Sequence, residues 1–135
     1  MNSMKTTITF SILIIFGMTS IAFAESYPDL GVKVEIVAEN LSIPWSIDFA
    51  PDGRIFFSER TGTLNVIENS IQKQIMSLNV GGGEGGMLGI ALDPDFESNH
   101  YIYIYYTYNE FLSTKNKLVR FVESNNVLTE DKILL

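Results

Sequence analysis

Five glycines around one glutamate form the segment of this sequence best suited to binding a ligand. The segment Gly81–Gly86, called here the glycine-rich loop, carries Glu84 as its only side chain. Its spacing Gly-x-Gly-x-x-Gly satisfies the dinucleotide-binding fingerprint, but that fingerprint requires a helix directly afterwards. Met87–Leu92 has the apolar pattern of a strand instead. Two interpretations stay open: a flexible connection between sheets, or a loop whose backbone approaches a flat ligand closely while Glu84 makes a polar contact.

A second set of oxygen-bearing side chains follows that strand. The motif Asp-x-Asp-x-Glu-x-Asn at Asp93–Asn99 places them at every second position, as calcium-binding loops do. The EF-hand loop also needs glycine at its sixth position and glutamate at its twelfth. Ser98 and Ile104 stand at those positions. We therefore expect this segment to form a turn through local side-chain hydrogen bonds, and we assign it no metal.

Histidine and serine offer no catalytic arrangement. His100 is the only histidine and stands at the turn that enters Tyr101, where we expect it to be exposed. A general base must instead be held within reach of the proton it abstracts. The serines Ser46, Ser58 and Ser77 lack the Gly-x-Ser-x-Gly context of a nucleophile elbow. The sequence therefore predicts no hydrolase, and we assign no catalytic residue.

An internal repeat indicates which elements position the glycine-rich loop. Ser46–Asp52 matches Gly89–Asp95 position by position, at an offset of 43 residues from Ile47 to Ile90. Each copy is an alternating strand followed by a Pro-Asp turn and a second apolar strand. A period of about 40 to 50 residues with several strands per unit is typical of the blades of a β-propeller.

The remaining chain divides into short strands separated by turn residues. We expect strands at 33–38, 45–50, 54–59, 64–68, 71–78, 87–92, 101–108, 117–123 and 127–135. Trp45 is expected in the core, with a ligand contact as the alternative, and Glu59 is expected to form a local ion pair with Arg60. The tyrosines at 101, 103 and 105 share one strand face. We expect this face to pack between neighbouring sheets, with a carbohydrate-stacking platform as the alternative.

The first 24 residues predict a signal peptide. Lys5 precedes the apolar stretch Ile8–Ile21, and Ala22–Ala24 is a small-x-small cleavage site. The apolar stretch is shorter than the roughly 20 residues of a spanning helix, so we expect cleavage and no stable membrane span. We therefore expect a secreted or periplasmic protein whose folded part is residues 25–135.

Composition excludes some partners and bounds the fold. The net charge is −7, which argues against nucleic acid and anionic membrane surfaces as partners. No cysteine is present, so disulfides and thiolate chemistry are excluded. The fold class is all-β: an incomplete β-propeller of two to three blades, whereas a closed ring needs at least about four. We expect residues 25–135 to be the N-terminal part of a longer protein, with a truncated product or a self-assembling half as alternatives.

Three motif blocks make the sequence resemble one family. They are IPWSIDFAPDGR at Ile43–Arg54, SERTG at Ser58–Gly62 and GEGGMLGIALDPDF at Gly83–Phe96. In this order they resemble the soluble glucose/sorbosone dehydrogenases, also called aldose sugar dehydrogenases, from about Val34 to Leu135. The resemblance implies an exported six-bladed propeller that carries pyrroloquinoline quinone (PQQ) and calcium. It implies oxidation of an aldose at its anomeric carbon, with the electrons passed on to an acceptor.

The resemblance assigns one cofactor contact to this sequence. Glu84 stands where characterised members have a glutamine that touches PQQ, so it places a negative charge beside an anionic cofactor. By this resemblance the family's catalytic histidine, its cofactor-binding arginines and lysine, and its calcium ligands belong to later blades. His100 does not match the motif of the catalytic histidine. We therefore expect these residues alone to be inactive. The alternative is a non-catalytic extracellular propeller used for binding or assembly.

Overall fold

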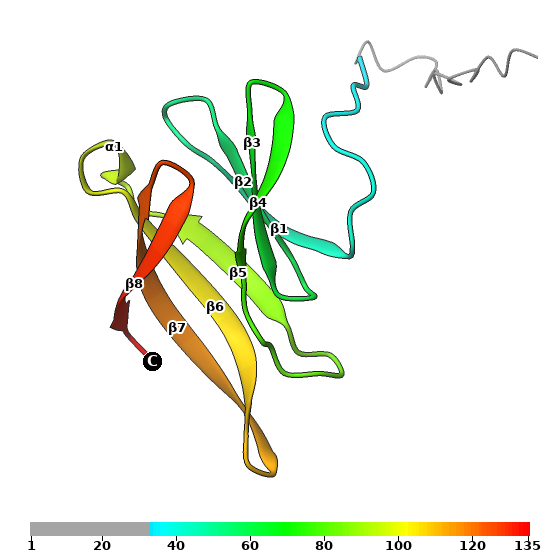
Figure 1. Cartoon of the computed structure of the whole chain (residues 1–135), viewed down its shortest axis with the longest axis vertical. Helices are drawn as coiled ribbons and strands as arrows, with labels where there is room; N and C mark the ends of the chain where they lie inside the picture. Colours follow the sequence, from blue (N-terminus) through cyan, green and yellow to red (C-terminus); the bar gives the residue numbers. More distant parts are fainter. Residues whose placement is uncertain (1–32) are drawn as a thin grey trace, which may run out of the picture. The chain divides into compact units, whose positions relative to one another are not determined.

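The computed structural model of the chain describes residues 33–135. The strands all belong to the compact unit Ile36–Leu135, shown in Figure 1. The predicted signal peptide, residues 1–24, lies outside the described residues. No helix among the described residues has the length and apolar character needed to cross a membrane.

Eight strands and one helical turn make up the fold (Figure 1). In chain order they are β1 (Pro44–Phe49), β2 (Ile55–Glu59), β3 (Thr63–Glu68), β4 (Ile71–Ser77), β5 (Met87–Leu92), α1 (Phe96–Asn99), β6 (Tyr101–Glu110), β7 (Ser113–Ser124) and β8 (Val127–Ile133). They form two four-stranded antiparallel sheets in the orders β1-β2-β3-β4 and β5-β6-β7-β8. These two sheets confirm the all-β class and are two blades of a propeller.

The repeat found in the sequence marks the first strand of each sheet. Ile47 of β1 pairs with Phe57 of β2, and Ile90 of β5 pairs with Ile104 of β6. In the first copy the chain reverses at Ala50–Arg54, where Gly53 has a φ of 88°, a conformation that favours glycine. The two Ile residues of the repeat therefore occupy equivalent strands, as predicted.

The hydrophobic core lies between the two sheets. Residues of both sheets form one buried cluster: Ala50, Phe56, Leu64, Val66, Met87, Phe96, Ile102, Ile104, Tyr106, Val119 and Phe121. Burying each large apolar side chain contributes about 1.5–3 kcal/mol. Burial alternates along β6 and β7, which aim one row of side chains at this core, whereas β2 and β3 are buried on both faces.

Hydrogen bonds from side chains also join the two first strands. The N–H of Ile90 donates to Ser46 Oγ at 3.3 Å, and the N–H of Leu92 donates to Asp48 Oδ2 at 2.8 Å. Since β5 is an edge strand of its own sheet, these two N–H groups would otherwise lack a protein partner. Strand β1 therefore holds β5 through its side chains.

Three expectations from the sequence were wrong. Residues 33–38 form no strand, although their side chains alternate, because no sheet edge pairs with them. Trp45 is 52% exposed and lies outside the core.

The carboxylate of Glu59 does not pair with Arg60. It accepts hydrogen bonds from the Ser42 N–H and the Thr63 hydroxyl, both at 2.5 Å.

The connections between strands gather at two opposite ends of the unit (Figure 1). The α1 end carries α1 and the β1–β2, β3–β4 and β7–β8 turns. The loop end carries the β2–β3 and β6–β7 turns and the β4–β5 connection, which contains the glycine-rich loop. The N–H of Met87 donates to Arg60 O at 3.1 Å and so ties the two sheets together at the loop end.

Candidate functional site

Both ends of the glycine-rich loop are bound to one residue of β6. Thr107 donates its N–H to Gly86 O at 2.9 Å and accepts the N–H of Gly81 on its carbonyl at 2.8 Å. Its Oγ1 accepts the N–H of Gly86 at 2.7 Å and donates to Gly81 O at 3.4 Å. Thr107 is 7% exposed, so these bonds form away from water. The loop is therefore fixed at its base. The interpretation of the loop as a flexible connection between sheets did not predict this anchoring.

The glycines of the loop are of two kinds. A Cβ on Gly85 would lie 2.3 Å from Thr107 Oγ1, and one on Gly86 would lie 2.1 Å from Arg60 O. Those two positions exclude a side chain because the chain packs against them. A Cβ on Gly82 or Gly83 would meet nothing within 4 Å. Glycine at the tip of the loop is therefore not required by packing within this unit.

The tip of the loop presents free backbone donors to its surroundings. Among the described residues, the N–H groups of Gly82, Gly83 and Glu84 donate to no protein acceptor. The N–H of Gly85 closes the turn on Gly82 O at 3.3 Å. Glu84 itself is exposed. Successive N–H groups in a turn form a concave site that favours anions, whereas the Glu84 carboxylate opposes one.

A cation lies beside this loop. Arg60 donates its N–H to Ile43 O at 2.9 Å, and its side chain runs against Gly86. Its guanidinium carbon stands 5.6 Å from the centre of the Trp45 ring. Within residues 33–135, Arg60 has no ion-pair partner. The loop end therefore combines a free positive charge, an exposed indole and free N–H donors.

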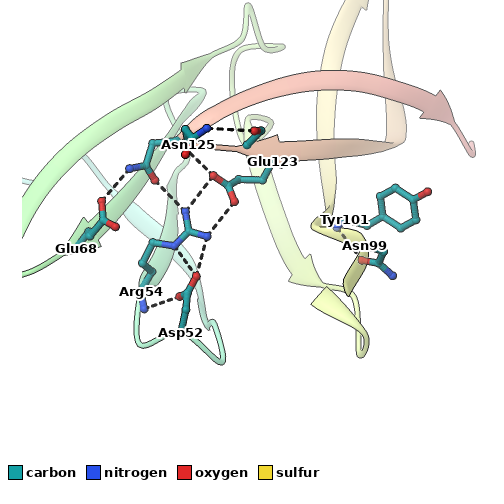
Figure 2. A network of polar contacts seen from close by, with 9 residues as sticks. Asp52, Arg54, Glu68, Asn99, Tyr101, Glu123 and Asn125 are labelled. Atoms are coloured by element: carbon teal, nitrogen blue, oxygen red, sulfur yellow. Dashed lines mark hydrogen bonds and ion pairs between the residues drawn. The ribbon is translucent and has the colours of Figure 1, made fainter. Parts of the chain in front are cut away.

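The α1 end carries the densest polar network, shown in Figure 2. Arg54 donates to both carboxylate oxygens of Glu123, at 3.0 and 2.9 Å, and to Asp52 at 2.8 Å. It also donates to Asn126 Oδ1 at 3.0 Å, and the Asn126 amide donates to Glu68 at 2.9 Å. Arg54 lies in the β1–β2 turn of the first sheet and Glu123 in β7 of the second, so this network clamps the two sheets together.

The electrostatics of this clamp suit structure better than cofactor binding. Burial by itself raises the pKa of Glu123, but hydrogen bonds from Arg54 and from the Asn126 N–H outweigh burial and lower it. The hydrogen bonds to Glu123 in turn raise the pKa of Arg54. Three carboxylates, those of Asp52, Glu68 and Glu123, line the same pocket as the single guanidinium of Arg54, and the buried pair of Arg54 and Glu123 is mutually satisfied. An anionic ligand would meet net repulsion at this end.

The Asp93 motif begins as the predicted turn, but its second half, Phe96–Asn99, forms α1. Asp93 Oδ1 accepts the N–H of Asp95 at 3.0 Å and the Asn99 amide at 2.9 Å. The hydroxyl of Tyr103 donates to the other oxygen at 2.6 Å, and these hydrogen bonds lower the pKa of Asp93. His100 is exposed and ends α1 with a φ of 55°. His100 therefore lies at the end of the unit opposite to Glu84.

The tyrosine face stays without a covering sheet among the described residues. Tyr101, Tyr103 and Tyr105 alternate with buried residues and are half-buried themselves. The guanidinium of Arg120 stands 4.1 Å from the centre of the Tyr101 ring. Packing against another sheet and stacking on a carbohydrate both stay predictions for this face.

Two residues of the loop end were missed by reasoning from sequence. Thr107 follows a run of tyrosine and isoleucine in β6 and shows no local signal of its contact with the loop. Arg60 lies inside the motif Ser58–Gly62, so the motif was found but the role of its arginine was not. Both roles depend on the packing of one sheet beside the other.

Comparison with known proteins identifies relatives of this chain. A family model described as glucose/sorbosone dehydrogenase matches residues 41–135. The quinoprotein glucose dehydrogenase B of Acinetobacter calcoaceticus is 33% identical over 91 residues, which are 62% of this chain and 19% of that protein. An uncharacterised Synechocystis protein is 24% identical over 115 residues, 76% of this chain and 28% of its own length.

Solved structures resemble the same residues. A Thermus thermophilus protein classed as an oxidoreductase, glucose dehydrogenase, matches with a TM-score of 0.72 and 33% identity, over 78% of this chain and 32% of its own. The PQQ-bound aldose sugar dehydrogenase of Streptomyces coelicolor matches with a TM-score of 0.64 and 29% identity, over 73% and 31%. This chain thus spans about a third or less of the length of these relatives. Because the family model covers most of it, the chain belongs to the glucose/sorbosone dehydrogenase family.

Proposed function

We propose that these two blades are part of an exported PQQ-dependent dehydrogenase that oxidises an aldose at its anomeric carbon. The observation that carries the proposal is the glycine-rich loop, which is fixed at its base and open at its tip. It also bears Glu84, for which the resemblance implies a contact with the cofactor. The PQQ-bound relative from Streptomyces coelicolor supports the choice of cofactor. Because the chain spans a third or less of its relatives, we assign the complete activity to more blades than these two.

The groups at the loop end fit one edge of a flat anionic cofactor. The N–H groups at 82–84 and the guanidinium of Arg60 are donors without a protein acceptor in the described part of the chain. The glycine tip lets a planar molecule approach the backbone closely. When bound, PQQ would supply the ortho-quinone that accepts the hydride from the sugar. The role of the loop end is to bind and orient.

Two parts of the reaction are not supplied by residues 33–135. His100 is exposed at the α1 end, opposite to Glu84, so it cannot accept a proton from a substrate bound beside a cofactor at Glu84. Within the described residues, no group of three or more His, Cys, Asp or Glu side chains is placed to hold a metal ion. We therefore propose that calcium and the catalytic base, like most cofactor contacts, come from further blades.

The proposed export rests on the sequence of the first 24 residues. A charged residue, an apolar stretch and a small-x-small site follow one another in the order of a signal peptide. Mass spectrometry of the mature N-terminus after expression tests this proposal, and retention of residues 1–24 would contradict it.

The binding part of the proposal can be tested on this chain directly. Trp45 is the only tryptophan and lies half-exposed under Arg60, so PQQ at the loop end is expected to quench its fluorescence in a saturable way. Arg60→Met should weaken the quenching, while Arg120→Met, a change of the same kind far from the loop, should leave it unchanged. Quenching that does not saturate, or that Arg60→Met leaves unaltered, would contradict PQQ binding at this end.

The catalytic part requires the complete gene product. Reading the coding DNA beyond Leu135 and expressing the product with PQQ and calcium should give dye reduction with an aldose. No turnover across a broad panel of aldoses would overturn the proposal. That result would favour the second function, a non-catalytic binding or assembly propeller, which the acidic side chain at Glu84 specifically supports.

A further inference from the structure

We propose that Thr107 is the positioning residue of the cofactor site, because its hydroxyl sets the conformation of the glycine-rich loop. This inference takes its ligand, PQQ, from the proposed function. The anchoring of the loop by Thr107 rests on the geometry of β6 alone. Thr107 is 7% exposed and lies under the loop, so it acts on a ligand only through the loop.

Thr107 holds the loop at both ends with one residue. Its backbone pairs with Gly81 N–H and Gly86 O, and its hydroxyl bonds with Gly86 N–H and Gly81 O. The strongest side-chain bond, from Gly86 N–H to Oγ1 at 2.7 Å, satisfies a buried backbone donor. A buried donor without a partner is costly, so the loop would have to move if the hydroxyl were absent.

The chemistry of the hydroxyl explains why threonine suits this position. A hydroxyl accepts one hydrogen bond and donates another at the same time. Valine has the same shape but can do neither, whereas serine keeps both functions and loses only a methyl group. The close approach of the loop is also part of the device, because a Cβ on Gly85 would lie 2.3 Å from Oγ1. Glycine at that position lets the loop descend onto the hydroxyl.

The consequence for function lies at the tip of the loop. Gly81 and Gly86 are held, while a Cβ on Gly82 or Gly83 would meet nothing within 4 Å and Glu84 is exposed. With the base fixed, the N–H groups at the tip stay oriented before a ligand arrives, which lowers the entropy lost on binding. Releasing the base should therefore weaken ligand binding without any change in the groups that touch the ligand.

The test compares Thr107→Val with Thr107→Ser in the full chain. Two quantities are measured: amide hydrogen exchange at Gly86, and the Kd of PQQ from quenching of Trp45. We expect Thr107→Val to speed exchange at Gly86 and to raise the Kd, each by about tenfold or more, since both hydrogen bonds of the hydroxyl are lost. Thr107→Ser should restore both to within about threefold. The control Thr129→Val, made at an exposed threonine of β8, should change neither.

Each outcome decides between the inference and the proposed function. If Thr107→Val leaves Gly86 exchange and the Kd unchanged, the positioning role is wrong. If exchange rises and serine restores it but no form of the chain binds PQQ, the loop anchor is supported and the proposed cofactor is overturned. If Thr107→Val does not fold, amide hydrogen exchange in the unaltered chain decides. The inference then requires that the Gly86 amide is protected and that the Gly82 amide exchanges freely. Equal exchange rates at the two amides would overturn it.

Discussion

Replacing Arg54 by methionine tests how the two sheets are held together. Arg54 donates two parallel hydrogen bonds to Glu123, and the side chains of this pair are 12% and 2% exposed. Methionine keeps most of the aliphatic stem but removes the charge and all donors. The Glu123 carboxylate would then stay buried with only the N–H of Asn126, at 2.7 Å, as a donor.

The size of the effect follows from this burial. Removing one partner of a buried ion pair costs about 3–5 kcal/mol, because the other charge is left uncompensated. For a domain of about 100 residues each kcal/mol lowers Tm by about 4–8 °C, so Arg54→Met should lower Tm by about 12 °C or more. Asp52 adds little, since its side chain is 48% exposed and its pair with Arg54 is hydrated.

Urea unfolding followed by circular dichroism measures the change in unfolding free energy. Arg120→Met is the matched control, because the pair of Arg120 with Asp131 is more exposed, at 26% and 33%, and should contribute about 1 kcal/mol or less. The double variant Arg54→Met/Glu123→Leu should regain most of the loss, since no buried charge remains. If Arg54→Met costs no more than Arg120→Met, the pair is not the clamp inferred here.

Three further perturbations have expected outcomes. The pKa of Glu123 is lowered in the folded state, so its contribution to stability is complete above the unfolded pKa of about 4.5 and is lost as pH falls through the folded pKa. Glu123→Gln should therefore make the unfolding free energy, measured by urea titration, less dependent on pH in the acid range. Glu84→Gln should tighten PQQ binding by about three- to tenfold at low salt and by less at high salt. It removes a repulsion of about 1 kcal/mol between the Glu84 carboxylate and the anionic cofactor in a hydrated site. Weaker binding would show that Glu84 is a favourable contact. Gly85→Ala should destabilise the chain by about 1–3 kcal/mol through its clash with Thr107, whereas Gly82→Ala should stay within about 0.5 kcal/mol in the same unfolding assay.

The strands were predictable because their signals are local. Alternation in β1, β5 and β6 and the Pro-Asp turns state where a chain extends and reverses, and the repeat from Ile47 to Ile90 states which strands are equivalent. The segment 33–38 shows the limit of this reasoning. Its alternation is as good as that of a strand, but a strand also needs a neighbouring edge, which no local pattern reveals.

The site was only partly predictable because its anchors are distant in sequence. The glycine-rich loop was found by composition, and Glu84 by resemblance. The contact of Thr107 with Gly86 spans 21 residues, and that of Arg54 with Glu123 spans 69. Such contacts depend on how one sheet packs beside the other, so reasoning on single strands assigned Thr107 no role.

The repeat preserves the shape of the blades but not their polar contacts. In the first copy Ser46 and Asp48 accept the N–H groups of Ile90 and Leu92, and so hold the first strand of the next sheet. The same positions in the second copy are Gly89 and Ala91, whose side chains have no acceptor. A sheet placed against the tyrosine face could not be held by this pair of hydrogen bonds. It would have to depend on apolar and aromatic packing, for which the half-buried tyrosines of β6 are suited.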